Sequence, residues 1–175
     1  MPKRYFLDAC VLYAAVNEKD NYHYRVKSFL EKIVKENSEM FVTQYVLLEY
    51  ILLSKIRASR EYFEKNPDLF ILPKEENDKI IEKIKETLIT LDGIGIKLLK
   101  VFLPEKLKND LKEIAYRYTP KRKRLEKVKH IGLVDLIHLV SCSILNCDTF
   151  VTFDKDFKDQ AILNSFEESF RIWVL

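Results

Sequence analysis

Glycine, paired cysteines and long apolar runs are scarce in this chain of 175 residues. Its glycines are Gly93, Gly95 and Gly132, and they form no Gly-x-Gly-x-x-Gly loop, which disfavours a dinucleotide-binding enzyme. The three cysteines include no Cys-x-x-Cys pair, a pattern typical of reduced intracellular thiols rather than of a zinc site. No apolar run approaches the roughly 20 residues that cross a bilayer, and the N-terminus lacks the apolar stretch of a secretory signal. We therefore expect a cytoplasmic protein without a membrane partner.

The length and composition fit one folded domain. Hydrophobic residues make up 47% of the chain and charged residues 33%, a balance typical of globular proteins. The net charge of +3 arises in segment 119–130, "TPKRKRLEKVKH", which holds six basic residues and one Glu. The basic residues are Lys121, Arg122, Lys123, Arg124, Lys127 and Lys129. Such a segment is either a solvated loop or a patch that binds the phosphates of a nucleic acid.

Short apolar runs alternate with helical patterns along the chain. Candidate strands lie at 4–7, 40–43, 69–73, 149–153 and 171–175. Helical patterns include 44–63, 75–91, 105–118, 132–145 and a segment near 157–165. Segment 92–104 carries turn-forming glycines and an apolar run that fits a strand or a helix. Strands that alternate with helices predict an α/β fold, in which helices cover both faces of a mainly parallel sheet.

Two acidic residues lie inside apolar helical patterns, where an unpaired charge is costly. Glu49 stands in "YVLLEYILL", and none of its neighbours on the same helical face is basic. Asp135 stands in "IGLVDLIHLV", and His138 is the polar residue one turn further on. An Asp135–His138 pair is one interpretation of this second pattern, and a functional carboxylate is the other.

Two further carboxylates follow candidate strands directly. Asp8 comes after the strand at 4–7, and Asp154 comes after the strand at 149–153. Each residue either begins a helix as its N-cap or faces a cation at the end of the strand. Asp156 is the better capping candidate near the second strand, because the helix is expected to begin just after it.

These four carboxylates support one another as candidates for a site. Ligand sites in open parallel sheets lie at the carboxyl ends of the strands, where we expect the four side chains to gather. Like charges that gather without compensation repel and raise each other's pKa. An acidic set without zinc-type ligands favours a hard cation that prefers oxygen ligands, Mg²⁺ or Mn²⁺.

Three stretches of this sequence resemble the PIN-domain ribonucleases. They are "YFLDACVLYAAV", "FVTQYVLLEYI" and "LVDLIHLVSCSILNCDTFVTFDKDF". The resemblance implies a three-layer α/β/α fold with four or five strands, in one domain over 1–175. Relative to the compact toxin members of the family, the region at about 92–130 is expected to be an insertion that is partly helical and basic.

The resemblance also implies a function and a set of site residues. The function is metal-dependent hydrolysis of RNA phosphodiester bonds. The acidic metal site would consist of Asp8, Glu49, Asp135 and Asp154, with Thr152 as the hydroxyl residue at the strand end and Asp156 as an accessory acid or cap.

Other functions are weighed against this one. Aspartyl-phosphate phosphatases usually carry a second Asp two residues after the first, where this chain has Cys10. The alternative that remains is a non-catalytic RNA-binding or scaffold protein that retains the fold. Within the nuclease interpretation, the toxin of a toxin–antitoxin pair and an RNA-processing nuclease both stay open. The expected partners are RNA and, for a toxin, a cognate antitoxin protein; a homodimer is also left open.

Overall fold

A sheet of five parallel strands forms the centre of the structure, a computed structural model that describes residues 2–102, 132–158 and 170–175. The strands are β1 (Arg4–Leu7), β2 (Glu39–Thr43), β3 (Ile96–Leu99), β4 (Thr149–Thr152) and β5 (Arg171–Val174). Their order across the sheet is β3-β2-β1-β4-β5, and every neighbouring pair is parallel. The strand order therefore reverses its direction between β1 and β4, and ligand sites in such sheets lie at this switch point.

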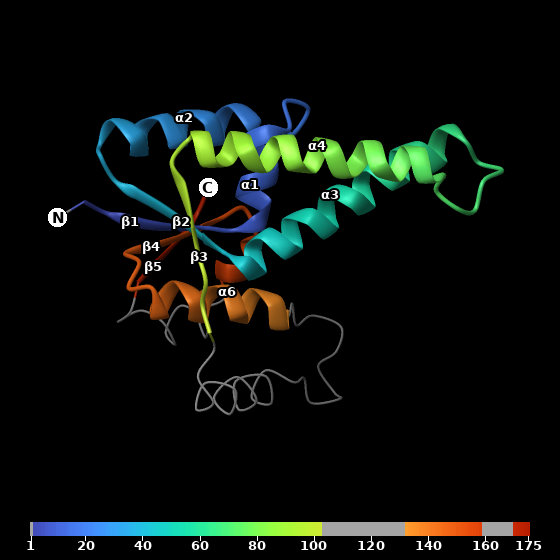
Figure 1. Ribbon diagram of the computed structural model, residues 1–175. Helices are drawn as coiled ribbons and strands as arrows, with labels where there is room; N and C mark the ends of the chain where they lie inside the picture. The colour runs from blue at the N-terminus through green and yellow to red at the C-terminus, as the bar shows by residue number, and fades with distance from the viewer. Residues whose placement is uncertain (1, 103–131, 159–169) are drawn as a thin grey trace, which may run out of the picture.

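Helices cover both faces of the sheet. They are α1 (Ala9–Val16), α2 (His23–Lys35), α3 (Gln44–Lys65), α4 (Lys74–Gly93) and α6 (Leu133–Ile144). Figure 1 shows α2 on one face and α6 on the other. α1 and α3 begin directly after β1 and β2, so both helices start at the carboxyl edge of the sheet. The predicted α/β/α architecture with a parallel sheet is confirmed.

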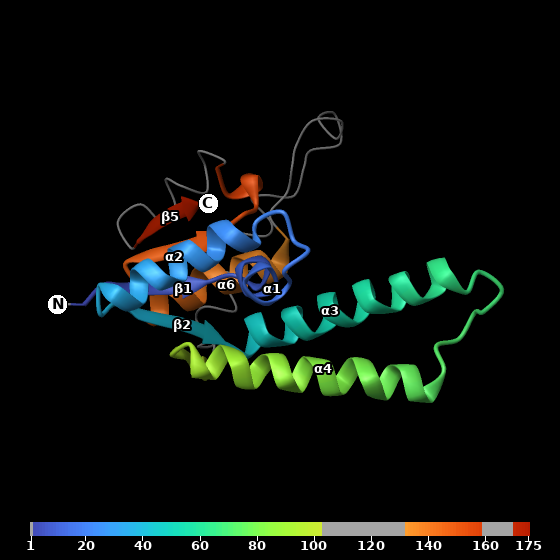
Figure 2. The ribbon, with the colours of Figure 1, turned by 90° about the horizontal axis from the view of Figure 1, so that it is seen from above.

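The α3–α4 hairpin projects beyond the sheet, as Figure 2 shows from above. The predicted strand at 69–73 is wrong, because this segment links the two helices at the far end of the hairpin. Its apolar side chains face solvent: Phe70 is 91% and Ile71 82% exposed. The 22 residues of α3 carry the chain about 33 Å from the sheet at 1.5 Å per residue, so 69–73 lies out of reach of a strand. The edge strand that pairs with β2 is β3, which lies within the segment 92–104 that fitted a strand or a helix.

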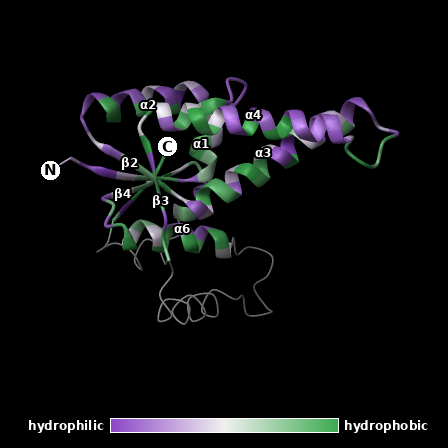
Figure 3. Cartoon of the chain, viewed as in Figure 1, coloured by the Kyte–Doolittle hydropathy of each residue, from purple (hydrophilic) through white to green (hydrophobic). Residues whose placement is uncertain are grey.

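Aromatic side chains fill the core where β1 meets β4. Phe6 and Phe150 lie on these adjacent strands, fully buried, with ring centroids 5.8 Å apart. Phe157 also packs against Phe150, with a centroid distance of 5.0 Å. Helices on both faces leave the central strands buried at almost every position rather than at alternate ones. Figure 3 shows the resulting contrast between hydrophobic strands and the hydrophilic residues along α2 and α4.

The side chain of Gln44, the first residue of α3, binds the chain that follows the edge strand β3. The amide group of Gln44 donates to the carbonyl oxygen of Val101 at 2.6 Å and accepts from its backbone N–H at 3.0 Å. This pair of hydrogen bonds imitates a backbone ladder and joins the chain after β3 to α3. It therefore restrains the helix that carries Glu49.

The predicted helix at 105–118 lies outside the described residues. Of the helical segment predicted near 157–165, the structure describes residues 157 and 158, which belong to the 3₁₀ helix η1 (Lys155–Lys158). Within the described part of the chain, no helix is both long and apolar enough to cross a membrane.

The packing at β4 leads to a stability prediction. Phe150→Ala removes a fully buried ring between two others, and we expect it to lower the free energy of unfolding by about 3–5 kcal/mol. Phe70→Ala is the matched control, because its ring is exposed and its loss should cost within about 0.5 kcal/mol. Urea unfolding followed by circular dichroism measures both values. Equal effects of the two variants would contradict this description of the core.

Candidate metal centre

The carboxylate of Asp8 is held by groups from two adjacent strand ends. Its Oδ1 accepts from the backbone N–H of Ala9 at 2.7 Å, so Asp8 is the N-cap of α1. Its Oδ2 accepts from the hydroxyl of Thr152, at the end of β4, at 2.6 Å. Asp8 is only 5% exposed, and this burial raises the pKa of its carboxyl group. Of the two roles that the sequence left open for Asp8, the structure shows the N-cap, and binding of a cation stays a prediction.

Cys10 lies against the same carboxylate. Its Sγ is 3.1 Å from Asp8 Oδ2 and 3.4 Å from Thr152 Oγ1, and it accepts from the backbone N–H of Phe153 at 3.3 Å. Burial and the charge of Asp8 raise the pKa of the Cys10 thiol. The group therefore stays protonated at neutral pH and donates to Asp8, rather than acting as a thiolate ligand.

Glu49 finds its partner on another helix. Its Oε2 lies 2.6 Å from Nε2 of His138, so α3 and α6 meet through this contact. His138 is 0% exposed, and its Nδ1 is buried without a hydrogen-bond partner. The lack of a basic neighbour within α3 is thus compensated by a residue 89 positions further along the chain. The alternative Asp135–His138 hydrogen bond is absent, because Nε2 binds Glu49 and Nδ1 binds no group.

Asp135 lies in the first turn of α6, close to the same charges. Its Oδ2 accepts from the backbone N–H of Gly132 at 2.8 Å and so caps the helix. Burial raises the pKa of Asp135 to about 6, against the lowering effect of the Gly132 hydrogen bond. The negative charges of Asp8 and Glu49 raise it further. This mutual repulsion between carboxylates is the effect that the sequence predicted.

Asp154 lies at the exposed rim, beyond the end of β4. Its Oδ1 accepts from the backbone N–H of Asp156 at 2.8 Å, and its own N–H donates to Thr152 Oγ1 at 3.0 Å. Asp154 therefore caps η1, whereas Asp156 lies in the first turn of η1. The prediction that Asp156 is the better cap is wrong for η1, because this helical turn begins at Lys155, two residues earlier than the sequence suggested. The hydroxyl of Thr152 connects Asp154 to Asp8.

Three side chains converge closely enough to hold a metal ion. Asp8, Glu49 and His138 each offer one ligand atom, and these atoms lie within 4.8 Å of one another. Among residues 2–102, 132–158 and 170–175, this is the one such group of His, Cys, Asp or Glu. Asp135 and Asp154 lie outside it. Whether they are metal ligands stays a prediction, as does the part of Asp156. The basic residues between 121 and 129 lie outside the described residues.

The ligand atoms of Asp8, Glu49 and His138 fit a divalent cation and indicate which ion binds best. Two carboxylates and one imidazole suit Mn²⁺, whereas Mg²⁺ prefers oxygen ligands throughout. His138 and Cys10 are the site residues that the sequence did not assign. The signal for His138 was present, since a polar residue recurs one turn after Asp135 in an apolar helix.

Comparison with known proteins agrees with this geometry. The sequence model of the PIN domain family matches residues 5–163, and the chain belongs to this family. PIN domains are generally nucleases, and they use divalent metal ions. A search of the curated proteins finds no match to the chain.

The raised pKa of Asp135 predicts how stability depends on pH. The folded protein holds this proton until about pH 6, whereas the unfolded chain releases it near the ordinary value of 3.8. Ionisation therefore opposes folding, and we expect the free energy of unfolding to fall as the pH rises from about 4 to 6. Asp135→Asn should flatten this fall and keep an acceptor for Gly132. Asp8 contributes in the same direction, so part of the slope should remain.

Urea unfolding of the metal-free protein between pH 4 and 7.5 measures this effect. Asp154→Asn is the control, because its side chain is exposed and should leave the slope unchanged. A slope in Asp135→Asn equal to that of the wild type would contradict the electrostatic description of the site.

Proposed function

We propose that this protein is a metal-dependent ribonuclease whose reaction centre contains Asp8, Glu49 and His138. The observation that carries the proposal is the convergence of these three side chains beside the switch point of a PIN-domain sheet. Mn²⁺ or Mg²⁺ bound there would supply the positive charge that activates water and stabilises the phosphate during hydrolysis. Asp135, Asp154 and Asp156 are proposed to assist from the rim, and residues 121–129 to contact the RNA backbone.

Hydrogen bonds from neighbouring residues orient the two carboxylates of the site, Asp8 and Glu49. The N–H of Ala9 orients the Asp8 carboxylate through Oδ1, and the hydroxyl of Thr152 and the thiol of Cys10 orient it through Oδ2. Oδ1 keeps an unused acceptor position. His138 donates to Glu49 and so supplies the partial positive charge that this carboxylate needs while no cation is bound. Nε2 of His138 must give up this contact to become a ligand, whereas Glu49 keeps further acceptor positions for a cation. Cation binding should be weaker at low pH, because protons compete with the cation for its ligand atoms.

Asp135 is suited to proton transfer. With a pKa of about 6, its carboxyl group exchanges a proton readily near neutral pH. It begins the helix that also carries His138, and its charge interacts with Asp8 and Glu49. We propose that it accepts a proton from the attacking water, while Asp8 and Glu49 act chiefly as ligands.

The biological role follows from the RNA that is cleaved. A toxin that acts beside an antitoxin protein would cleave one essential RNA, whereas a processing nuclease would trim precursors. We propose that the whole chain acts as one nuclease domain, in which residues 92–130 influence the choice of RNA. Cleavage of labelled RNAs of each class distinguishes the two roles.

Substitutions within the cluster test the catalytic proposal. Asp8→Asn and Glu49→Gln keep the size of the side chain but remove its charge, and we expect kcat/KM for RNA to fall by about a thousandfold, or about 4 kcal/mol. Asp154→Asn should cost less, because its carboxylate lies outside the cluster. Asp68→Asn, in the link between α3 and α4, is the control. The assay is cleavage of labelled RNA with Mn²⁺, Mg²⁺ or EDTA.

Two results would count against this assignment. Full activity in Asp8→Asn or Glu49→Gln would remove these residues from the reaction. RNA binding without metal-dependent cleavage in the wild type would instead support the non-catalytic, RNA-binding alternative.

Stability measurements test metal binding without any assay of activity. Mn²⁺ at a hundred times its Kd should raise the free energy of unfolding by about 2.7 kcal/mol if the unfolded chain does not bind it. Glu49→Gln should reduce this gain. His138→Gln should weaken Mn²⁺ binding more than Mg²⁺ binding, because imidazole is the softer ligand. Equal losses for the two ions would show that His138 is not a ligand.

A further inference from the structure

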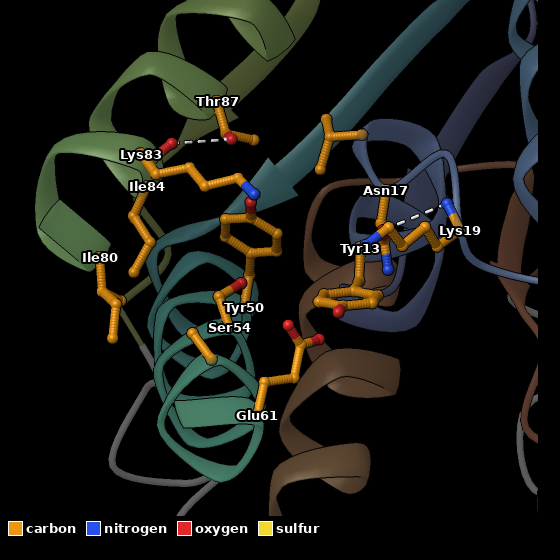
Figure 4. Close-up of a pocket in the computed structure, with 12 residues that line it drawn as sticks. Tyr13, Asn17, Lys19, Tyr50, Ser54, Glu61, Ile80, Lys83, Ile84 and Thr87 are labelled. Atoms are coloured by element: carbon orange, nitrogen blue, oxygen red, sulfur yellow. Dashed lines mark hydrogen bonds between the residues drawn. The ribbon is translucent and has the colours of Figure 1, made fainter. Parts of the chain in front are cut away.

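The long helix α3 lines a different hollow with each of two faces. One face lines a cavity that α1 and α4 also line, with Tyr50, Ser54 and Glu61 among its residues (Figure 4). The other face forms a surface groove that α3 alone lines among the described elements. This α3 groove consists of Lys55, Ile56, Ser59, Arg60, Phe63 and Glu64. Residues four apart lie on the same side of a helix, so these six form one continuous strip.

The apolar part of this strip extends towards the sheet. Leu48, Leu52 and Ile56 follow one another at intervals of four residues, and they are 57%, 51% and 55% exposed. Exposed apolar side chains that share one helix face are typical of a surface that contacts another protein. The α3 groove and its extension therefore indicate a docking surface, and the order of its residues indicates what docks there.

The six residues of the α3 groove form three pairs about the midpoint between Ser59 and Arg60. Lys55 is paired with Glu64, Ile56 with Phe63, and Ser59 with Arg60. A two-fold axis through this midpoint would set each residue opposite the other member of its pair in a second copy of the chain. Opposite charges would then meet at Lys55 and Glu64, and apolar side chains would meet at Ile56 and Phe63. The groove is thus complementary to itself.

The charged residues favour this partner over others. Among the residues that the structure describes, none of Lys55, Arg60 and Glu64 belongs to an ion pair. Lys55 and Glu64 are about 13.5 Å apart along α3, so they cannot meet within one chain. A partner of one charge would be repelled by one end of the groove, and a parallel second copy would set like charges together. An antiparallel second copy satisfies both ends.

We propose that the α3 groove is the interface of a homodimer in which two α3 helices pack antiparallel. A stable dimer buries about 800 Å² of each copy, so the contact extends along α3 beyond the six groove residues. Antiparallel packing directs the exposed Phe70 and Ile71 at the end of one hairpin towards the exposed Leu48 and Leu52 of the partner. The apolar link between α3 and α4 thereby obtains a place to pack.

Exchange of charges tests the proposed register of the two helices. Sedimentation equilibrium of the full chain at micromolar concentrations should show a dimer. Lys55→Glu and Glu64→Lys should each weaken association by about tenfold or more, because two attractive pairs become repulsive. An equal mixture of the two variants should associate as the wild type does, because the new carboxylate at position 55 meets the new ammonium group at position 64. The double variant should recover for the same reason.

A pair of isoleucines tests the apolar part of the interface. Ile56→Asp should leave the protein monomeric, whereas Ile89→Asp should not, because Ile89 is 73% exposed on α4 and lies outside the groove. Circular dichroism checks that each variant is folded.

Three results would overturn the proposal. They are a monomeric wild type, which would leave the groove to a different protein, a dimer that Ile56→Asp does not weaken, and a mixture of the charge variants that does not recover. These measurements use no RNA, so their outcome is separate from that of the ribonuclease assay.

Discussion

The hydrogen bond between Thr152 and Asp8 is the contact on which the arrangement of the site depends. It joins the ends of β1 and β4, the strands at which the order of the sheet reverses. The same carboxylate begins α1, and the same hydroxyl accepts from the N–H of Asp154. One buried Asp–Thr pair thus determines where a helix begins, how two strands end and where the neighbouring acid lies.

Charge compensation explains the remainder of the site. The negative charge of Glu49 raises the pKa of both Asp8 and Asp135, and the charge of Asp8 also raises that of Asp135. Burial disfavours the charged forms of Asp8 and Asp135 as well. Hydrogen bonds compensate the carboxylates in part: Thr152 and Cys10 donate to Asp8, Gly132 donates to Asp135, and His138 donates to Glu49. These donors lower the cost of an acidic cluster but leave it suited to a divalent ion.

The metal cluster and a nearby cavity are built on the same helices. The short helix α1 and the long helix α3 each contribute to the metal cluster at one end and to the cavity lined by Tyr13 and Tyr50 further on. The α3–α4 hairpin, which extends beyond the sheet in Figure 2, lines that cavity with residues of α4. An extension that the sheet does not require thus forms one wall of this cavity.

The sequence by itself determined the fold class, four of the five strands and the acidic character of the site, because these depend on local apolar runs and on carboxylates placed without local partners. It did not reveal that Phe70 and Ile71 lie at an exposed hairpin end, because an apolar run has the same pattern whether or not a strand lies within reach. Only the tertiary structure brought His138 to Glu49 and gave the capping role at η1 to Asp154 rather than Asp156. Each of these contacts depends on the relative positions of helices that are distant in the chain or on where a turn begins, and neither follows from residue spacing along one element.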